Sequence, residues 1–377
     1  MLQHAHKMRI LHRARRVVIK VGSSVLSTAD GIQQESVIRL VHDLADLRHR
    51  GNEVILVTSG AVASGMSRLG MKTRPKTIPG KQAAAAVGQI ALMALYERYF
   101  SQHEVHVAQI LLTHDDLANR RRYLNAKHTM LTLLEAKVLP IVNENDTVAV
   151  EEIQFGDNDN LSALVAVLVE ADLLVILSDV AGLYNKDPRA HADAQLVSLI
   201  EKVDNDVFAQ AGGVGALGRG GMLSKLQAAQ KAAVSGIPTI VADGRQTHTL
   251  AAVFDVTKET GTLFLPEADR LTSRKHWIAY ILKPAGDLIV DPGACTAIRE
   301  RGRSLLSPGV REVRGTFSEG ECVTCFDDLG RAFARGLVNY SSDALARIKG
   351  TKTSQIEQIL GYKVSDEVIH RDDLALL

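Results

Sequence analysis

The sequence predicts an α/β protein in two parts: a three-layer αβα sandwich around a mostly parallel β-sheet, then a small β-rich domain. Short runs of Val, Ile and Leu alternate with longer helical stretches over about the first 240 residues, a pattern typical of a parallel sheet covered by helices. Only 4% of the residues are aromatic, so the core must consist of aliphatic side chains that suit such packing. After about residue 265, short strand-like segments separated by turns replace this alternation.

The apolar runs predict the strands of the sheet. Buried parallel strands are expected at residues 17–21, 54–58, 107–112, 138–143, 173–178 and 237–242. Helices are predicted between them, at residues 34–50, 81–100, 119–136 and 161–170. Gly51 and Gly236 stand where the glycine that follows a helix is expected. Ligands of parallel sheets bind beyond the carboxyl ends of the strands, so the residues after each run are the first candidates for a site.

The turns divide the chain into regions. Pro- and Gly-containing turns recur from residue 284 onward, and they mark the start of the β-rich part. We therefore predict a catalytic domain at residues 1–264, a linker at 265–283, the small β-rich domain at 284–362 and a C-terminal tail at 363–377.

Composition excludes several classes of protein. The formal net charge is +1, so no global field attracts nucleic acid or membranes. The basic segment from His4 to Arg16 is expected to be a solvated tail rather than a nucleic-acid-binding arm. It lacks the apolar core of a signal peptide, and no apolar run approaches the roughly 20 residues of a membrane span. The chain has three cysteines, so a disulfide framework is not expected and a reducing cytoplasm fits.

The first two runs end in candidate ligand-binding segments. Lys20 lies in the first run, ahead of a Gly-Ser-Ser turn. A lysine in a buried strand is costly unless an anion pairs with it, so one interpretation is phosphate contact. The other is a side chain that extends to the edge of the sheet. The small residues from Ser59 to Gly65 permit close approach of a ligand, although an ordinary turn explains them equally well.

Polar residues follow the fourth run and precede the fourth predicted helix. Asp146 is a candidate partner for a substrate ammonium group, unless its loop satisfies its own turn. Asp157, Asn158, Asp159 and Asn160 precede an apolar helix. One N-cap needs one such residue, and here there are four, so the surplus is available to a substrate and to lysines.

Two loops and a cysteine pair complete the candidates. Ser178 and Asp179 open a loop that suits a nucleotide base and ribose, or is an ordinary surface loop. The glycine-rich segment 218–225 leads to Lys225 at the start of a helix, as in a loop that covers phosphates or in a mobile linker. The pair Cys322 and Cys325 resembles half of a metal site without its second half, so a structural role in a strand is expected.

Taken in order, these motifs resemble those of the glutamate 5-kinases, a branch of the amino acid kinase family. The most specific parts are VTSGA, VNEND, GDNDNLSAL, GLY with DPR, and GGM with SK. The C-terminal region is similar to a PUA domain. The resemblance implies that ATP phosphorylates the γ-carboxylate of L-glutamate, the first step of proline biosynthesis. It also implies Mg²⁺ bridging the phosphates, proline as an inhibitor, and a dimer or tetramer working with a glutamyl phosphate reductase.

The resemblance assigns expected roles to individual residues. Catalysis would depend on Lys20, Lys225 and Asp159, with the carboxylate orienting both ammonium groups. The residues expected to bind glutamate are Ser59, Asp146 and Asn158. The residues expected to bind ATP are Lys20, Ser178, Asp179, Arg219, Gly220, Gly221, Met222, Leu223, Ser224 and Lys225. No protein ligand for a metal is expected.

Two positions depart from the family pattern, which often has Thr in place of Arg219 and of Ser178. Serine keeps the hydroxyl group, whereas Arg219 places an extra cation beside the phosphates. The charged segment Thr113–Tyr123 is expected to take part in inhibition or assembly.

Two alternative functions stay open from the sequence. One is a kinase of the same fold that acts on another carboxylate or a carbamate. The other is an RNA-associated protein, because PUA-like domains often bind RNA. However, residues 284–362 hold 10 Lys+Arg and 10 Asp+Glu, so this region has no net positive charge for phosphates and RNA is not an expected partner.

Overall fold

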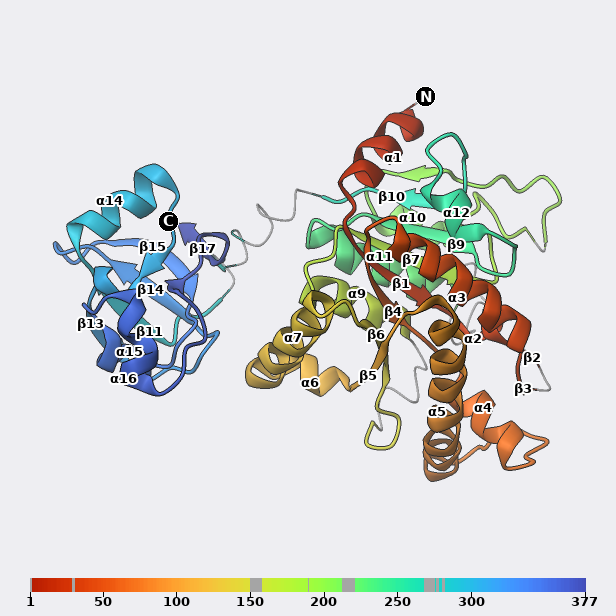
Figure 1. Cartoon of the computed structure of the whole chain (residues 1–377). Coiled ribbons are helices and arrows are strands. Elements are labelled where there is room, and N and C mark those ends of the chain that lie inside the picture. Colours follow the sequence, from red (N-terminus) through yellow and green to blue (C-terminus); the bar gives the residue numbers. More distant parts are fainter. Residues whose placement is uncertain are drawn as a thin grey trace. The chain divides into compact units, whose positions relative to one another are not determined.

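The computed structural model describes residues 2–28, 31–149, 158–188, 190–211, 221–267, 275, 278–279 and 282–377. The chain divides into two compact units (Figure 1), one built from residues 1–118 and 125–268 and the other mainly from residues 269–377. Each unit has its own sheet and its own apolar core.

The first unit is built on an eight-stranded sheet. Within the described residues its strand pairs are parallel, apart from the antiparallel pair β9–β10. In spatial order the strands are β5 (Val107–Leu112), β6 (Leu139–Glu144), β4 (Glu53–Val57), β1 (Arg16–Val21), β7 (Leu173–Ser178), β9 (Thr239–Asp243), β10 (Thr262–Phe264) and β8 (Leu199–Ile200). All six predicted strands are thereby confirmed, while the short strands β8 and β10 were not predicted.

Helices cover both faces of this sheet (Figure 1). They are α1 (Leu2–Arg13), α2 (Ser23–Leu26), α3 (Gln34–His49), α4 (Ala61–Arg68), α5 (Ile78–Phe100), α6 (His114–Ala118), α7 (Arg120–Glu135), α9 (Asn158–Leu168), α10 (Asn205–Ala211), α11 (Met222–Val234) and α12 (Thr249–Phe254). A two-stranded hairpin, β2 (Ser27–Thr28) with β3 (Gly31–Ile32), and the 3₁₀ turn η1 (Ser101–His103) complete the unit. The glycines predicted to follow α3 and α11, Gly51 and Gly236, have φ angles of 92° and 76°.

The two sides of β1 face different helices. Val17, Ile19 and Val21 belong to the core formed with α3, α5 and α12. Successive side chains of a strand point to opposite faces, so Lys20 lies on the other face, where α9 packs against β1. This alternation places the lysine on the side of the sheet that carries the start of α9.

Helices α4 and α5 cross in direct backbone contact at Gly65 and Gly88. A Cβ atom on Gly65 would lie 1.7 Å from the carbonyl oxygen of Ala84, and one on Gly88 would lie 1.8 Å from that of Ala61. Because these contacts are with backbone atoms, no side-chain rotation can relieve them. The crossing fixes the start of α4, which directly follows Ser59 and Gly60.

We therefore expect the substitution Gly88→Ala to lower the free energy of unfolding by about 2 kcal/mol or more, because the methyl group must push the two helices apart. Chemical denaturation of the purified protein measures this loss. Ala86→Ser, at an exposed position on the same helix, is the matched control and should change stability by less than about 0.5 kcal/mol. Equal stability of the two variants would contradict the tight crossing.

The basic start of the chain is not a solvated tail, and that expectation was wrong. Residues Leu2–Arg13 form helix α1, with Ile10 and Leu11 packed against the core. Lys7 is only 3% exposed, and its Nζ donates to the carbonyl oxygens of Asp255 at 2.9 Å and Lys258 at 2.6 Å. The lysine thus satisfies carbonyl groups beyond the end of α12, so the helix is part of the folded unit.

The second unit contains a five-stranded sheet and a two-stranded sheet. The larger sheet has the order β13 (Val310–Gly315), β11 (Gly286–Val290), β14 (Cys322–Phe326), β15 (Ala332–Leu337) and β17 (Leu374–Leu376), and the smaller pairs β12 (Leu305–Leu306) with β16 (Glu367–Ile369). The remaining elements are α14 (Pro292–Arg301), η3 (Ser307–Gly309), α15 (Ser342–Ile348), η4 (Thr353–Gln355), α16 (Ile356–Leu360) and η5 (Arg371–Asp373). Residues 363–377, predicted as a tail, supply β16 and β17 and therefore lie within these sheets.

The cysteines of the second unit are free and buried. Cys322 and Cys325 lie in β14, and burial raises the pKa of the Cys325 thiol to about 12. In the described part of the chain, no group of three His, Cys, Asp or Glu side chains is arranged to hold a metal ion. Nor does any helix there combine the length and apolar character needed to cross a membrane.

Candidate active site

Four neighbouring strands deliver the candidate residues to one edge of the sheet. In the order β6, β4, β1 and β7, their carboxyl ends carry Asn143, Thr58, Lys20 and Ser178. The next residue after Thr58 is Ser59, which leads into α4. The parallel arrangement explains why motifs far apart in the sequence meet here.

A buried cluster of two lysines and one aspartate lies at this edge. Lys20 Nζ forms an ion pair with Asp159 Oδ1, and Lys225 Nζ lies 3.1 Å from Asp159 Oδ2. Ser224 Oγ donates to the same Oδ2 at 2.7 Å. Asp159 is fully buried, and the lysines are 6% and 4% exposed. We call these three residues the Lys–Asp–Lys cluster; its formal charge is +1.

The cluster keeps Asp159 ionised. Burial alone would raise the pKa of this carboxyl group, but the charges of Lys20 and Lys225 and the hydrogen bond from Ser224 outweigh it and hold the pKa below the ordinary value of 3.8. An aspartate with a lowered pKa and both oxygens engaged is a poor proton acceptor. In the structure it instead holds two ammonium groups close together.

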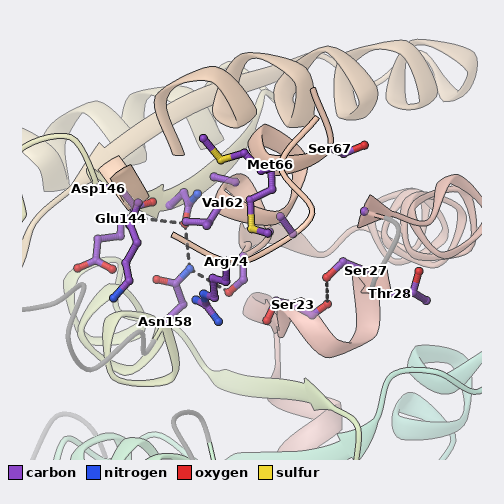
Figure 2. A pocket seen from close by; sticks show the side chains of 18 of the residues that line it. Ser23, Ser27, Thr28, Val62, Met66, Ser67, Arg74, Glu144, Asp146 and Asn158 are labelled. Carbon is purple, nitrogen blue, oxygen red and sulfur yellow. Dashed lines mark hydrogen bonds between the residues drawn. The ribbon is translucent and has the colours of Figure 1, made fainter. Parts of the chain in front are cut away.

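Figure 2 shows a cavity of about 690 Å³ that is lined by all three predicted glutamate-binding residues, Ser59, Asp146 and Asn158. The two sites meet at the first turn of α9. Asn158 lines the cavity, while the next residue, Asp159, holds the lysines. A residue that lines the cavity and the residue that holds the lysines are therefore neighbours in the chain.

Asp146 is half-buried at the cavity wall, in the loop after β6. Burial raises its pKa to about 6. Because the group is still mostly ionised at neutral pH, it presents a negative charge that lacks full hydration. Such a carboxylate is suited to bind a positively charged group of a ligand.

Several lining residues were not identified from the sequence. The cavity also exposes the cations Lys72, Arg74 and Lys81, together with Glu144. The three cations come from the α4–α5 connection and the first turn of α5 (Figure 2 labels Arg74). The sequence offered one sign of these cations, which is the density of basic residues between positions 72 and 81. No motif there distinguishes a ligand-binding segment from a solvated loop.

Those expected nucleotide-binding residues that the structure describes lie outside this cavity lining. Helix α11 begins at Met222, directly after Gly221, and Lys225 lies in its first turn. The positive end of the helix dipole is therefore close to Lys225. Ser178 Oγ donates to Asp179 Oδ1 at 3.1 Å at the end of β7. Arg219 and Gly220 lie outside the described residues, as does Asp157.

A pair of buried ammonium groups at a helix N-terminus, next to a cavity lined by polar and charged side chains, fits a small-molecule kinase. The chain belongs to the amino acid kinase family, whose model matches residues 15–243, and a PUA domain matches residues 286–360.

Relatives are similar over nearly their full length. Glutamate 5-kinase of Pelobacter propionicus is 50% identical over 370 residues, covering 98% of this chain and 99% of the relative. Glutamate 5-kinase of Thioalkalivibrio sulfidiphilus is 53% identical over 369 residues, covering 97% and 98%. Among solved structures, carbamate kinase from Giardia lamblia bound to AMP-PNP is 16% identical, with a TM-score of 0.49 over 67% of this chain and 99% of that one.

Proposed function

We propose that this protein is a glutamate 5-kinase, which transfers the γ-phosphoryl group of ATP to the γ-carboxylate of L-glutamate. The observation that carries the proposal is the junction of the Lys–Asp–Lys cluster with the cavity lined by Ser59, Asp146 and Asn158. The cluster suits the phosphates of ATP, and the cavity suits an amino acid. The high identity to glutamate 5-kinases selects glutamate from the possible acceptors.

The reaction needs no general base. The γ-carboxyl group of glutamate has a pKa near 4.3 and is already ionised at neutral pH. A carboxylate oxygen attacks the γ-phosphorus, the bond to the bridging oxygen breaks, and ADP leaves. The obstacle is repulsion between the anionic nucleophile and the phosphates. Lys20 and Lys225 would neutralise the charge on the transferring group, and Asp159 would keep their ammonium groups in place.

Magnesium would be held mainly by ATP. Both oxygens of Asp159 are already occupied by lysines and Ser224, which fits an ion bound through phosphate oxygens and water rather than by a protein cage. When bound, the ion would add further neutralisation of the phosphates.

The cavity suits the two charged groups on the α-carbon of glutamate. Asp146 would pair with the α-ammonium group. The cations around the cavity, of which Arg74 offers a planar fork of donors, would pair with the α-carboxylate. The hydroxyl of Ser59 accepts a hydrogen bond from Asn158 Nδ2 at 3.1 Å, so its own hydrogen can be donated to a substrate carboxylate.

The direct test is formation of an acyl phosphate. The protein is incubated with ATP, Mg²⁺ and L-glutamate, and the product is trapped with hydroxylamine as a hydroxamate. A parallel panel contains aspartate, N-acetylglutamate and carbamate. Hydroxamate from glutamate alone supports the proposal, whereas activity only with another acceptor would replace glutamate as the substrate.

Asp146 should make glutamate binding pH-dependent. With a pKa of about 6 in the free enzyme, the carboxylate is protonated as the pH falls and loses its attraction for the ammonium group. We expect kcat/KM for glutamate to fall about tenfold per pH unit below pH 6, while KM for ATP changes little. Asp146→Asn should remove this dependence and raise KM for glutamate at neutral pH. A profile unchanged in that variant would contradict the assignment.

The wider assignments are proposals of the same kind. The protein would work as a cytoplasmic homodimer or tetramer, be inhibited by proline, and pass its labile product to a glutamyl phosphate reductase. Residues 1–264 would form the kinase domain and 265–283 the linker. The PUA-like domain would begin at residue 284 and include the strands of residues 363–377. A proline titration of the hydroxamate assay tests the inhibition.

A further inference from the structure

Hydrogen-bonded side-chain amides connect α5, the end of β6 and the start of α9, and two of them, Asn143 and Asn158, line the cavity. Gln89 Oε1 accepts from Asn143 Nδ2 at 2.8 Å, and Asn143 Oδ1 accepts from Asn158 Nδ2 at 2.9 Å. On the far side, Gln89 Nε2 donates to Gln109 Oε1 at 3.4 Å. Asn143 is 3% exposed and Asn158 is 8% exposed, so both amides are buried and depend on these partners.

Two backbone groups fix the direction of these amides. The N–H of Glu144 lies 2.9 Å from Asn143 Oδ1, and since an N–H can only donate, the oxygen of Asn143 must face it. The carbonyl oxygen of Thr58 lies 2.5 Å from Asn158 Nδ2, and since it can only accept, the nitrogen of Asn158 must face it. Neither amide can be reversed without placing like groups against each other.

This direction determines what Asn158 offers to a ligand. Its Nδ2 is used by Thr58, Ser59 and Asn143. In Figure 2 the dashed lines leave this nitrogen, and the amide oxygen is turned away from them, toward the side where Glu144 is labelled. Asn158 and Asp146 both line the cavity. An amide oxygen can only accept, so it suits an ammonium group and disfavours a carboxylate.

We propose that Gln89 and Asn143 are positioning residues for recognition of the α-ammonium group of glutamate. Asn143 holds the amide of Asn158 so that its oxygen and the carboxylate of Asp146 form a pair of acceptors. Gln89 holds Asn143, because it supplies the acceptor for a buried Nδ2 that no other described residue satisfies. Without that acceptor, the buried Nδ2 of Asn143 is left unsatisfied, which weakens the hold of Asn143 on the amide of Asn158. The proposal rests on glutamate being the substrate.

The test compares glutamate with glutarate, which lacks the α-ammonium group. Gln89→Met keeps the length of the side chain but removes the acceptor. We expect it to lower the preference for glutamate over glutarate, measured as the ratio of kcat/KM values, about 10-fold through KM for glutamate. KM for ATP should stay the same. Gln89→Glu restores an acceptor toward Asn143 and should recover the preference.

A matched control separates this role from general stability. Gln109→Met removes the other hydrogen bond of Gln89 and leaves the acceptor facing Asn143 intact, so the preference should stay at the wild-type value. Equal loss of activity with both substrates in Gln89→Met, or no recovery in Gln89→Glu, overturns the positioning role. Calorimetric titration of the wild-type protein with glutamate distinguishes failure of the positioning role from failure of the proposed function. If the wild-type protein neither binds nor turns over glutamate, the proposed function is overturned, and this inference with it.

Discussion

The Lys225→Ala variant is expected to lose a factor of about 10²–10³ in kcat, the typical cost of removing one donor that stabilises transferring charge. Its ammonium group is buried against Asp159 beside the N-terminus of α11, where little water is available to replace it. Lys20→Ala should lose as much, because Lys20 occupies the other oxygen of the same carboxylate.

The measurement is steady-state kinetics with saturating ATP and glutamate, together with circular dichroism to verify the fold. Lys231→Ala is the matched control, since Lys231 lies on the same helix but is exposed and bonded to Asn160 Oδ1 at 2.7 Å. It should keep kcat within about twofold. Near-normal turnover in Lys225→Ala would remove the lysine from the catalytic machinery.

The strands and the residues at their ends could be predicted because each is set by local pattern. An apolar run such as residues 173–178 is buried on both faces wherever it lies in a parallel sheet, so its position and length follow from the sequence. The rule that ligands bind at the carboxyl ends then selects Lys20, Ser59 and Asp146. The short strands β8 and β10, with two and three residues, have too little pattern to be recognised.

The remaining errors have a common cause, which is that the partner of a residue is distant in the sequence. Lys7 was expected in solvent because its own segment is basic, yet its carbonyl partners lie at Asp255 and Lys258. Gln89 sits on an apolar helix and has no neighbouring motif. Its importance comes from Asn143, 54 positions away. Residues 363–377 likewise gain their structure from pairing with β12 and β15.

The Asp159→Asn variant should lose stability as well as activity, unlike the lysine variants. In the wild-type protein two ammonium groups share one carboxylate, and asparagine leaves both of them buried without a negative partner. Removing one member of a buried ion pair typically costs about 3–5 kcal/mol. Lys20→Met instead leaves Lys225 paired with Asp159 and a neutral cluster, so it should lose turnover while keeping most of its stability.

Chemical denaturation as a function of pH provides the decisive comparison. The pKa of Asp159 is lowered in the folded state, so this group stabilises the fold at pH values above its ordinary 3.8 and loses that contribution as the pH falls through the folded-state value. The difference in unfolding free energy between wild type and Asp159→Asn should therefore be largest at neutral pH and shrink on acidification. A constant difference would mean that the loss comes from packing, and that the cluster is held together by its surroundings rather than by charge.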